Sequence, residues 1–285
     1  MQINSSTTLI ALFASPCKHS ISPIMHNEAF DKLNLNYAYL SFEVDNNNLK
    51  DAVQAIKTFN MRGVNLSMPN KKEVIKYLDK ISEAAELSQS VNTIVNDNGI
   101  LTGYSTDGEG FIKSLENENV FIKDKNITIL GTGGASIAII SQAALYGVKK
   151  IYVFKKDTNW QEQKKIIDNI ASKTNCNIEL FSLENKNILK EKIDDSYVLI
   201  NATSVGMKEN VSLINDDSFF RKDLIVSDCI YNPAKTKLLQ IAEKNGCKII
   251  NGIGMLLYQG ALAFELWTNK QMPVEHIKNI IFNRN

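Results

Sequence analysis

The sequence predicts an α/β protein built from two domains. Three observations support this prediction. Apolar strand patterns alternate with helical patterns along the chain, and a glycine-rich turn at 131–136 separates a short apolar strand from a helix. A chain of 285 residues, 44% of them hydrophobic, is also long enough to bury two cores.

The predicted elements divide the chain near residue 108. Strands at 9–13, 37–44 and 63–66 alternate with helices at 23–33 and 48–59, in the manner of a parallel α/β sheet. Strands recur at 127–130, 151–154, 197–201, 224–228 and 248–250, an arrangement typical of a Rossmann-like domain. We therefore expect domains at 1–108 and 109–253. The last helices, 254–267 and 273–282, can pack on either domain, and we favour segment 254–285 joining the first.

The charge balance argues for a small-molecule partner. With 32 basic and 31 acidic residues the formal net charge is +1, so the chain lacks the basic footprint of proteins that bind nucleic acid or anionic membranes. The longest apolar run, 255–267, is shorter than the ~20 residues that span a bilayer. No Lys or Arg precedes Lys18, so the N-terminus lacks the basic flank of a secretory signal. We expect a cytoplasmic protein.

The cysteines and histidines do not form a recognisable metal motif. The four cysteines show neither Cys-x-x-Cys pairing nor zinc spacing with the histidines, so we expect reduced thiols and no metal. His19 and His26 lie seven residues apart across a predicted strand-to-helix junction. Local hydrogen bonding of these two imidazoles is favoured over a shared metal.

The glycine-rich turn predicts a dinucleotide site. Gly131 permits a tight turn after strand 126–130, and Gly133 lets the backbone approach a pyrophosphate at the N-terminus of the next helix. Asp157 follows the second apolar strand, 24 residues after Gly133, where a carboxylate meets an adenosine ribose. A plain strand-to-helix turn is the alternative. The flanking strands and the acid favour the dinucleotide.

Two serines next to a predicted helix start suggest an anion pocket. Ser20 and Ser22 are two residues apart, so an extended backbone points both hydroxyls to one face, and Pro23 suits the first helical position. In the alternative interpretation Ser22 only caps the helix. The two roles are compatible, because a capped helix N-terminus still attracts a carboxylate.

A lysine follows the strand at 63–66. Ser67-Met-Pro69-Asn-Lys71 ends this strand and leads into a charged helix predicted at 72–78. A cation at a helix start is poorly placed for the helix dipole, so Lys71 gains no stability there. It is either a solvated surface residue, as expected of its neighbour Lys72, or a functional one.

A predicted β-hairpin gathers polar residues. Asn98-Gly99 is a strong two-residue turn between strands 94–97 and 100–103. This register places Asn92 opposite Ser105, with Asp107 as its diagonal neighbour at roughly 7–8 Å on the same face. In the alternative interpretation Asp107 caps a helix at 108–115. That alternative does not account for Asn92.

Taken together, the motifs resemble the shikimate dehydrogenase family along the whole chain. The matching segments are His19-Ser-Ile-Ser-Pro23, Met25-His-Asn27, Ser67-Met-Pro-Asn-Lys71, Val91-Asn-Thr93, Ser105-Thr-Asp107-Gly, Gly131-Thr-Gly-Gly-Ala135, Asn201-Ala-Thr-Ser-Val-Gly-Met207, Tyr231-Asn-Pro233 and Gly252-Ile-Gly-Met-Leu-Leu-Tyr-Gln259-Gly. Three segments look most like the quinate/shikimate dehydrogenase branch, which accepts either acid and can use NAD as well as NADP: Met61-Arg-Gly63, Ser67-Met-Pro-Asn-Lys71 and Leu266-Trp-Thr268.

The resemblance implies a substrate domain and a dinucleotide-binding domain with an active-site cleft between them. It implies reversible, NAD(P)-dependent oxidation of shikimate or quinate to the 3-dehydro acid, with Lys71 and Asp107 as catalytic acid–base residues. Which of the two carries the proton is left open. The implied substrate-binding residues are Ser20, Ser22, Ser67, Asn92 and Gln259.

The implied cofactor-binding residues are Gly131, Thr132, Gly133, Gly134, Ala135, Lys155, Asp157, Cys229, Tyr231 and Gly252. The family usually has Asn followed by basic residues where this chain has Lys155-Lys-Asp157. Lys155 or Lys156 suits a 2′-phosphate, whereas Asp157 repels it and accepts a hydrogen bond from a bare 2′-hydroxyl. We therefore expect NAD, with NADP as the alternative. Ser105 and Ser204 also depart from the family pattern.

Alternatives from other classes remain open at this point. A strict shikimate dehydrogenase of aromatic biosynthesis would use NADP. A non-catalytic ligand sensor would keep the fold without turnover, but the retention of Lys71 and Asp107 argues against it. A Rossmann-like methyltransferase would not require the paired serines. The oligomeric state is expected to be monomer or homodimer.

Overall fold

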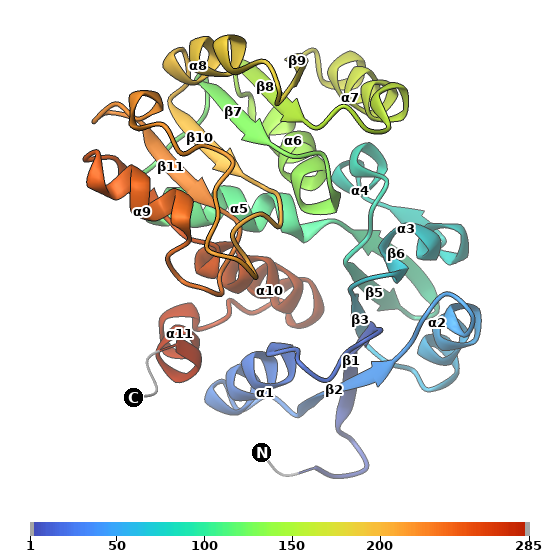
Figure 1. The fold of residues 1–285 in the computed structure, drawn as a ribbon. Coiled ribbons are helices and arrows are strands. Elements are labelled where there is room, and N and C mark those ends of the chain that lie inside the picture. Colours follow the sequence, from blue (N-terminus) through green and yellow to red (C-terminus); the bar gives the residue numbers. More distant parts are fainter. Residues whose placement is uncertain (1–2, 283–285) are drawn as a thin grey trace. The chain divides into compact units, whose positions relative to one another are not determined.

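The computed structural model describes residues 3–282 and divides the chain into two compact units. Unit 1 comprises the chain up to Thr106 together with the segment from Leu257 onwards, and unit 2 comprises Asp107–Leu256. Figure 1 follows the chain through both units. No helix within residues 3–282 combines the length and the apolar character needed to cross a membrane.

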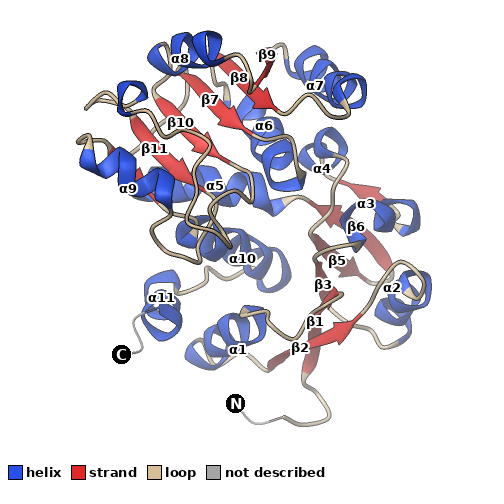
Figure 2. Ribbon diagram, viewed as in Figure 1, coloured by secondary structure: helices blue, strands red, loops and turns tan. Residues whose placement is uncertain are grey.

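Unit 1 is built on a mixed sheet. In the described chain the strand order is β2-β1-β3-β5-β6-β4 (Figure 2). The strands are β1 (Thr8–Ala14), β2 (Tyr37–Glu43), β3 (Gly63–Leu66), β4 (Lys80–Ile81), β5 (Thr93–Asp97) and β6 (Ile100–Tyr104). β1 is parallel to β2 and β3, as the sequence predicts, whereas β5 is antiparallel to both β3 and β6.

The predicted hairpin and its register are confirmed. Pairing runs from Thr93 with Tyr104 to Asp97 with Ile100. Asn98 and Gly99 have φ of 53° and 91°, and positive φ at both central residues defines a type I′ turn. A type I′ turn matches the right-handed twist of the strands, and Asn-Gly favours this turn type. The Asn98-Gly99 dipeptide therefore predicted the hairpin correctly.

Helices cover both faces of the sheet in unit 1. These helices are α1 (Ser22–Lys32), α2 (Leu49–Thr58), α3 (Asn70–Glu73), α4 (Glu83–Ser88), α11 (Val274–Phe282) and most of α10 (Ile253–Thr268), with a 3₁₀ helix, η1, at Val74–Tyr77. One face packs α2 and its neighbours into an aliphatic core with β1 and β3. The other face is aromatic, and there His26 of α1 stacks on Phe264 of α10 and meets Trp267 of α10 edge-on.

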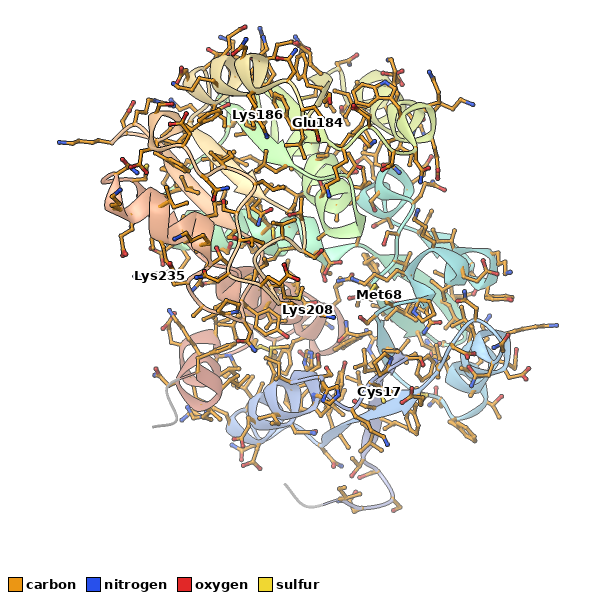
Figure 3. The ribbon with its side chains drawn as sticks, in the orientation of Figure 1. Cys17, Met68, Glu184, Lys186, Lys208 and Lys235 are labelled. Atoms are coloured by element: carbon orange, nitrogen blue, oxygen red, sulfur yellow. The ribbon has the colours of Figure 1, made fainter. Side chains whose placement is uncertain are left out.

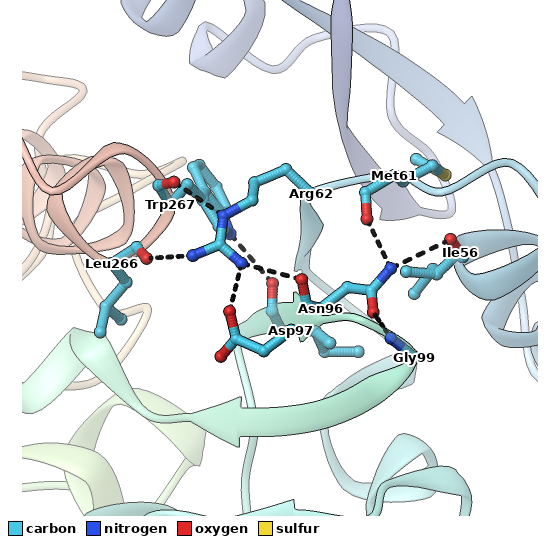
Figure 4. Close-up of polar contacts among 9 residues, drawn as sticks. Ile56, Met61, Arg62, Asn96, Asp97, Gly99, Leu266 and Trp267 are labelled. Carbon is cyan, nitrogen blue, oxygen red and sulfur yellow. Dashed lines mark hydrogen bonds and ion pairs between the residues drawn. The ribbon is translucent and has the colours of Figure 1, made fainter.

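Arg62 anchors the C-terminal end of α10 to the sheet (Figure 4). Its guanidinium donates to the carbonyls of Trp267 at 2.8 Å and Leu266 at 3.2 Å, and it pairs with Asp97 at 2.7 Å. A cation at a helix C-terminus is favourable because the last carbonyls carry partial negative charge. Gly63 permits this approach, since a Cβ there would lie 2.5 Å from Trp267 Nε1.

Unit 2 is a parallel doubly wound sheet. Its order within the described residues is β12-β11-β10-β7-β8-β9, which is the Rossmann order. The strands are β7 (Asn126–Leu130), β8 (Lys150–Lys155), β9 (Asn177–Ser182), β10 (Val198–Asn201), β11 (Ile225–Asp228) and β12 (Lys248–Ile250). The predicted Rossmann-like domain is confirmed. Edge strand β9 was not predicted, because its residues are only partly buried and lack a continuous apolar run.

Two separate cores flank this sheet. The helices of unit 2 are α5 (Thr106–Asn117), α6 (Gly134–Tyr146), α7 (Trp160–Thr174), α8 (Lys186–Asp194) and α9 (Lys237–Lys244). Ile127 and Ile129 of β7 face α5, α6 and α7, whereas Leu130 faces α8 and α9. Burial on both faces explains why the central strands are continuously apolar.

Candidate functional site

The glycine turn in unit 2 forms an open cradle at the N-terminus of α6. Gly131 has φ +108°, and a Cβ on it would come within 2.8 Å of the Thr203 side chain, so only glycine fits. Gly133 is the N-cap of α6, and no heavy atom of the described chain lies within 4 Å of a Cβ added there or at Gly134. The first N–H groups of α6 therefore border open space, as a phosphate site requires.

This cradle is one wall of a cavity of about 700 Å³ within unit 2. The remaining wall is formed by the segments that follow β10 and β11. The lining residues are Gly131, Thr132, Gly133, Gly134, Ala135, Ala202, Thr203, Ser204, Met207, Cys229, Ile230, Tyr231 and Asn232. Seven of the residues predicted to bind the cofactor, 131–135 with Cys229 and Tyr231, belong to this lining. Volume and lining fit a dinucleotide.

Gly252 does not line the cavity but packs against the backbone of Cys229 and Ile230, which do. A Cβ on Gly252 would lie 2.1 Å from the carbonyl oxygen of Cys229, so the position requires glycine for close backbone approach. Its N–H donates to the Ile230 carbonyl at 3.0 Å. Gly252 thus supports the loop that carries Cys229 and Tyr231.

A buried carboxylate joins the two segments of the wall. Asp228, at the end of β11, accepts hydrogen bonds from Asn201 Nδ2 at 3.1 Å, Thr236 Oγ1 at 2.7 Å and the Ile230 N–H at 3.0 Å. Burial raises the pKa of Asp228. Asn201 in turn accepts from the Thr203 hydroxyl at 2.7 Å. Sequence reasoning missed Asp228, although an acid inside an apolar strand was a usable signal.

Lys155 is buried, with its ammonium turned onto the loop that follows β8. The Lys155 Nζ donates to the carbonyls of Lys156 and Thr158 and lies 5.3 Å from the centre of the Trp160 ring. Lys156 and Asp157 are exposed on this loop. Among the described residues, neither Lys155 nor Asp157 lines the cavity.

The two serines near α1 adopt a different geometry from the predicted one. Ile21 between them is helical, with φ −87° and ψ −6°, so extended alternation does not align Ser20 and Ser22. The suggestion that Ser22 caps α1 is also wrong, because Ile21 is the N-cap and Ser22 begins the helix. The hydroxyl oxygen of Ser20 accepts from the Ser22 N–H at 3.2 Å. Both serines are partly exposed at this helix start.

Asn92 is held against the first residue of α5. Its Oδ1 accepts from the Thr106 N–H at 2.8 Å, and its Nδ2 donates to the Thr106 hydroxyl at 2.9 Å. The Thr106 hydroxyl also donates to the carbonyl of Gln259 at 3.0 Å. In unit 1, the Asn92 side chain and the Gln259 carbonyl are therefore both hydrogen-bonded to Thr106.

Asp107 lies in the first turn of α5, neither on the hairpin strand nor at the helix cap. The prediction that it continues the hairpin face is wrong, because the chain turns into α5 at Thr106. Hydrogen bonds between Thr106 and Asn92, one donated by each residue, stabilise this early helix start. A carboxylate in the first turn is favoured by the helix dipole.

Lys71 lies in the short helix α3, partly buried, whereas Lys72 is exposed. The predicted helix at 72–78 is instead α3 followed by η1. Asn70 fixes this segment by donating to the carbonyls of Phe13 at 3.2 Å and Val44 at 2.8 Å. Ser67 is partly buried at the end of β3, and Met68 beside it is 76% exposed (Figure 3).

Tyr39 is a buried residue that sequence reasoning missed. Its hydroxyl donates to Asn65 Oδ1 at 2.8 Å. Burial is the main cause that raises the pKa of Tyr39, so the phenol stays protonated. The sequence did not indicate a special role for Tyr39, because aromatic residues are common in strands such as β2.

His26 corrects a further prediction. Its imidazole is fully buried and stacks on Tyr39 with ring centroids 4.5 Å apart. Neither nitrogen has a hydrogen-bond partner among the described residues, so the predicted local hydrogen bonding is wrong for His26. Burial lowers the pKa of His26 to about 3. The side chain therefore acts as a neutral aromatic ring.

The four cysteines are free thiols, Cys17 among them (Figure 3). Burial raises the pKa of Cys229 at the cavity wall, with Asp228 and Asp107 adding to this effect. A raised pKa suppresses the thiolate, so Cys229 contributes shape and not nucleophilicity. Across residues 3–282, no group of His, Cys, Asp and Glu side chains is arranged to hold a metal ion.

The Rossmann sheet and the glycine cradle at the N-terminus of α6 are typical of a dinucleotide-binding enzyme. Comparison with known proteins identifies the family of this enzyme. The family model for the shikimate dehydrogenase substrate binding domain matches residues 12–94, and that for the shikimate 5'-dehydrogenase C-terminal domain matches residues 252–282. Together with relatives about 50% identical over nearly the whole chain, these matches show that the chain belongs to the shikimate dehydrogenase family.

Individual relatives match over nearly the full length. Shikimate dehydrogenase (NADP(+)) of Listeria innocua is 51% identical over 284 residues, which cover 99% of this chain and 98% of the relative. The crystal structure of shikimate 5-dehydrogenase from Listeria monocytogenes in complex with shikimate and NAD has a TM-score of 0.97 and 50% identity, covering 99% of both chains. Quinate dehydrogenase from Corynebacterium glutamicum in complex with NAD has a TM-score of 0.88 at 26% identity, covering 97% of this chain and 99% of that one.

Proposed function

We propose that the protein is a shikimate dehydrogenase that interconverts shikimate and its 3-dehydro acid with NADP(H). The proposal rests on 51% identity over 99% of the chain to a relative named shikimate dehydrogenase (NADP(+)). Quinate dehydrogenase is similar at 26% identity, so the branch that accepts both acids is the weaker hypothesis. This choice revises the expectation drawn from the motifs around Arg62 and Trp267.

The substrate residues we propose are those of unit 1. Ser20 and Ser22, near the N-terminus of α1, suit the ring carboxylate, because hydroxyl donors and a helix N-terminus both favour an anion. Asn92, Ser67 and the Gln259 side chain are proposed to hydrogen-bond the ring hydroxyls. The fixed position of Asn92 against Thr106 supports this role, since a preorganised amide loses little entropy on binding.

Lys71 and Asp107 are proposed as the acid–base residues. In the oxidation the alcohol carbon loses hydride and its hydroxyl loses a proton, so that the C–O bond becomes C=O. When bound, the dinucleotide supplies the nicotinamide ring that accepts this hydride. One of the two residues, Lys71 or Asp107, takes up the single proton at the hydroxyl oxygen, and in the reverse direction the same residue returns it.

The cofactor residues we propose are those around the glycine cradle, with Gly252 supporting the wall. The choice of NADP follows the names of the curated relatives. Lys156 is the candidate partner for a 2′-phosphate because it is exposed, whereas the Lys155 ammonium already bonds two backbone carbonyls. Asp157 opposes a phosphate and favours the bare 2′-hydroxyl of NAD. Together these two side chains set the preference.

The test is an initial-rate assay of the purified protein with shikimate or quinate against NAD or NADP, followed by the absorbance of the reduced nicotinamide. We expect the highest kcat/KM with shikimate and NADP. Comparable rates with quinate would instead support the hypothesis that the protein belongs to the branch that accepts both acids. Silence in all four combinations, with shikimate still binding, would favour the non-catalytic sensor.

A further inference from the structure

Asn65 stands out among the buried residues of unit 1. It lies on the central strand β3, is 7% exposed, and has apolar neighbours Val64 and Leu66 along the chain. Asparagine is disfavoured in strands, and a buried amide is costly unless it is hydrogen-bonded. A residue of this kind in a core strand calls for a specific role.

The amide of Asn65 is hydrogen-bonded on both sides. Its Oδ1 accepts from the Tyr39 hydroxyl on β2 at 2.8 Å. Its Nδ2 donates to the Asn92 carbonyl at 3.1 Å and to the Thr93 hydroxyl at 3.1 Å. Since β1 separates β2 from β3 in the sheet, the bond between Tyr39 and Asn65 joins strands that are not neighbours, whereas β5 lies next to β3.

The Nδ2 side of Asn65 leads to a proposed substrate residue. Asn65 Nδ2 bonds the Asn92 carbonyl directly, and the Thr93 hydroxyl that it also bonds donates to Asn92 Oδ1 at 3.2 Å. The Asn92 amide in turn bonds Thr106. On the other side the Tyr39 hydroxyl holds Asn65 Oδ1. One amide thus fixes the asparagine proposed for a ring hydroxyl.

We propose that Asn65 is a positioning residue that orients Asn92 for its substrate contact, through the Asn92 carbonyl and Thr93. The inference rests on the proposed function. Tyr39, Asn65, Asn92 and Thr93 are all buried, so removing the Asn65 amide leaves the Tyr39 hydroxyl and the Thr93 hydroxyl each without one partner. The Asn92 amide then loses a support that fixes its orientation, whereas the nucleotide cradle is unaffected.

Asn96 provides a matched control in the same unit. It is also a buried asparagine, 6% exposed, on the adjacent strand β5. Its Nδ2 donates to the Met61 carbonyl at 2.8 Å, and its Oδ1 accepts from the Gly99 N–H at 2.8 Å (Figure 4). These bonds support the hairpin turn and a loop, and neither is made with a proposed substrate residue.

The experiment compares Asn65→Ala with Asn96→Ala. Each variant is characterised by KM and kcat for shikimate, by Kd for NADPH from its fluorescence, and by the midpoint of urea unfolding. Both substitutions should lower the unfolding midpoint, since each removes buried hydrogen bonds. Only Asn65→Ala should raise KM for shikimate, by about tenfold, with Kd for NADPH unchanged.

Thr93→Val is the second variant, because valine keeps the shape of threonine and suits a strand. It removes the hydroxyl through which Asn65 acts on Asn92, so it should raise KM for shikimate in the same direction and add little to Asn65→Ala in the double variant. If Asn65→Ala does not fold, the KM of Thr93→Val for shikimate tests the proposal by itself.

Three results would count against the proposal. Wild-type KM in Asn65→Ala overturns it, as does an equal rise of KM in Asn96→Ala, which would mark a general loosening of the fold. An unchanged KM in Thr93→Val overturns the route through Asn92. If the wild-type protein itself does not turn over shikimate, the proposed function fails first, and this is seen in the same assay.

Discussion

The proposed binding surfaces of the two units are formed by different chemical groups. In unit 1 the surface depends on buried side-chain hydrogen bonds that run through Tyr39, Asn65, Asn92 and Thr106. In unit 2 it depends on backbone, since small residues of the glycine turn line the cavity. A ring with several hydroxyls needs directional partners, whereas a pyrophosphate needs N–H groups and room. The comparison predicts that the two surfaces respond differently to substitution.

The largest effect is expected at the acid–base residues. Lys71→Ala should lower kcat/KM for shikimate by about a thousandfold, because the transferred proton loses its partner, and Kd for NADPH should not change. Lys72→Ala is the matched control, since Lys72 is the exposed neighbour. Near-normal turnover in Lys71→Ala, or an equal loss in Lys72→Ala, would remove Lys71 from the mechanism.

A pair of glycine variants tests the backbone character of the unit 2 surface. Gly131→Ala should destabilise the protein by about 2 kcal/mol, because φ is +108° there and the new Cβ meets Thr203. Gly133→Ala should leave the urea unfolding midpoint nearly unchanged, because its Cβ enters open space, but should weaken NADPH binding. Tight NADPH binding in a stable Gly133→Ala protein would contradict the cradle.

The aromatic face of unit 1 predicts a pH dependence of stability. His26 has a pKa of about 3 in the folded protein and about 6.5 when unfolded, so below pH 6.5 the unfolded state binds more protons. This group therefore lowers the free energy of unfolding as pH falls, by about 1.4 kcal/mol between pH 7.5 and 5.5. The contribution is fully present above the unfolded pKa.

Urea unfolding at these two pH values checks the effect, with His26→Phe as the comparison. Phenylalanine keeps a ring against Tyr39 but does not titrate, so its unfolding free energy should change with pH by about 1.4 kcal/mol less than that of the wild type. Equal pH dependence in both proteins would show that His26 is not buried as a neutral ring.

The smallest effect is expected on the exposed loop after β8. Asp157→Ala should shift the ratio of kcat/KM for NADP over NAD in favour of NADP by up to about fivefold, and Lys156→Ala should shift it the other way. Both side chains are exposed, so solvent screens their interactions with a phosphate. An unchanged ratio in both variants would place the selectivity elsewhere in unit 2.

Local features of this chain were predictable from the sequence. The Asn98-Gly99 turn, the glycine turn at 131–134 and the central strands of unit 2 followed from constraints that act within a few residues. Positive φ favours glycine or asparagine, and strands buried on both faces must be apolar throughout. The motif order along the chain was likewise sufficient to identify the family.

What the tertiary structure decided involves residues far apart in the sequence. That Asn65 bonds Tyr39, that Thr106 begins α5 against Asn92, and that Lys155 turns onto its own loop depend on which strands pair and which side chains are buried together. His26 stacks without a hydrogen bond because α1 and α10 pack rings around it. The sequence by itself determined the central strands, the hairpin turn, the glycine turn and the family, because these depend on local conformational preference and on residue order. Only the packed structure determined the polar network, because a hydrogen bond between distant residues exists only once the strand order has placed its two ends within about 3 Å.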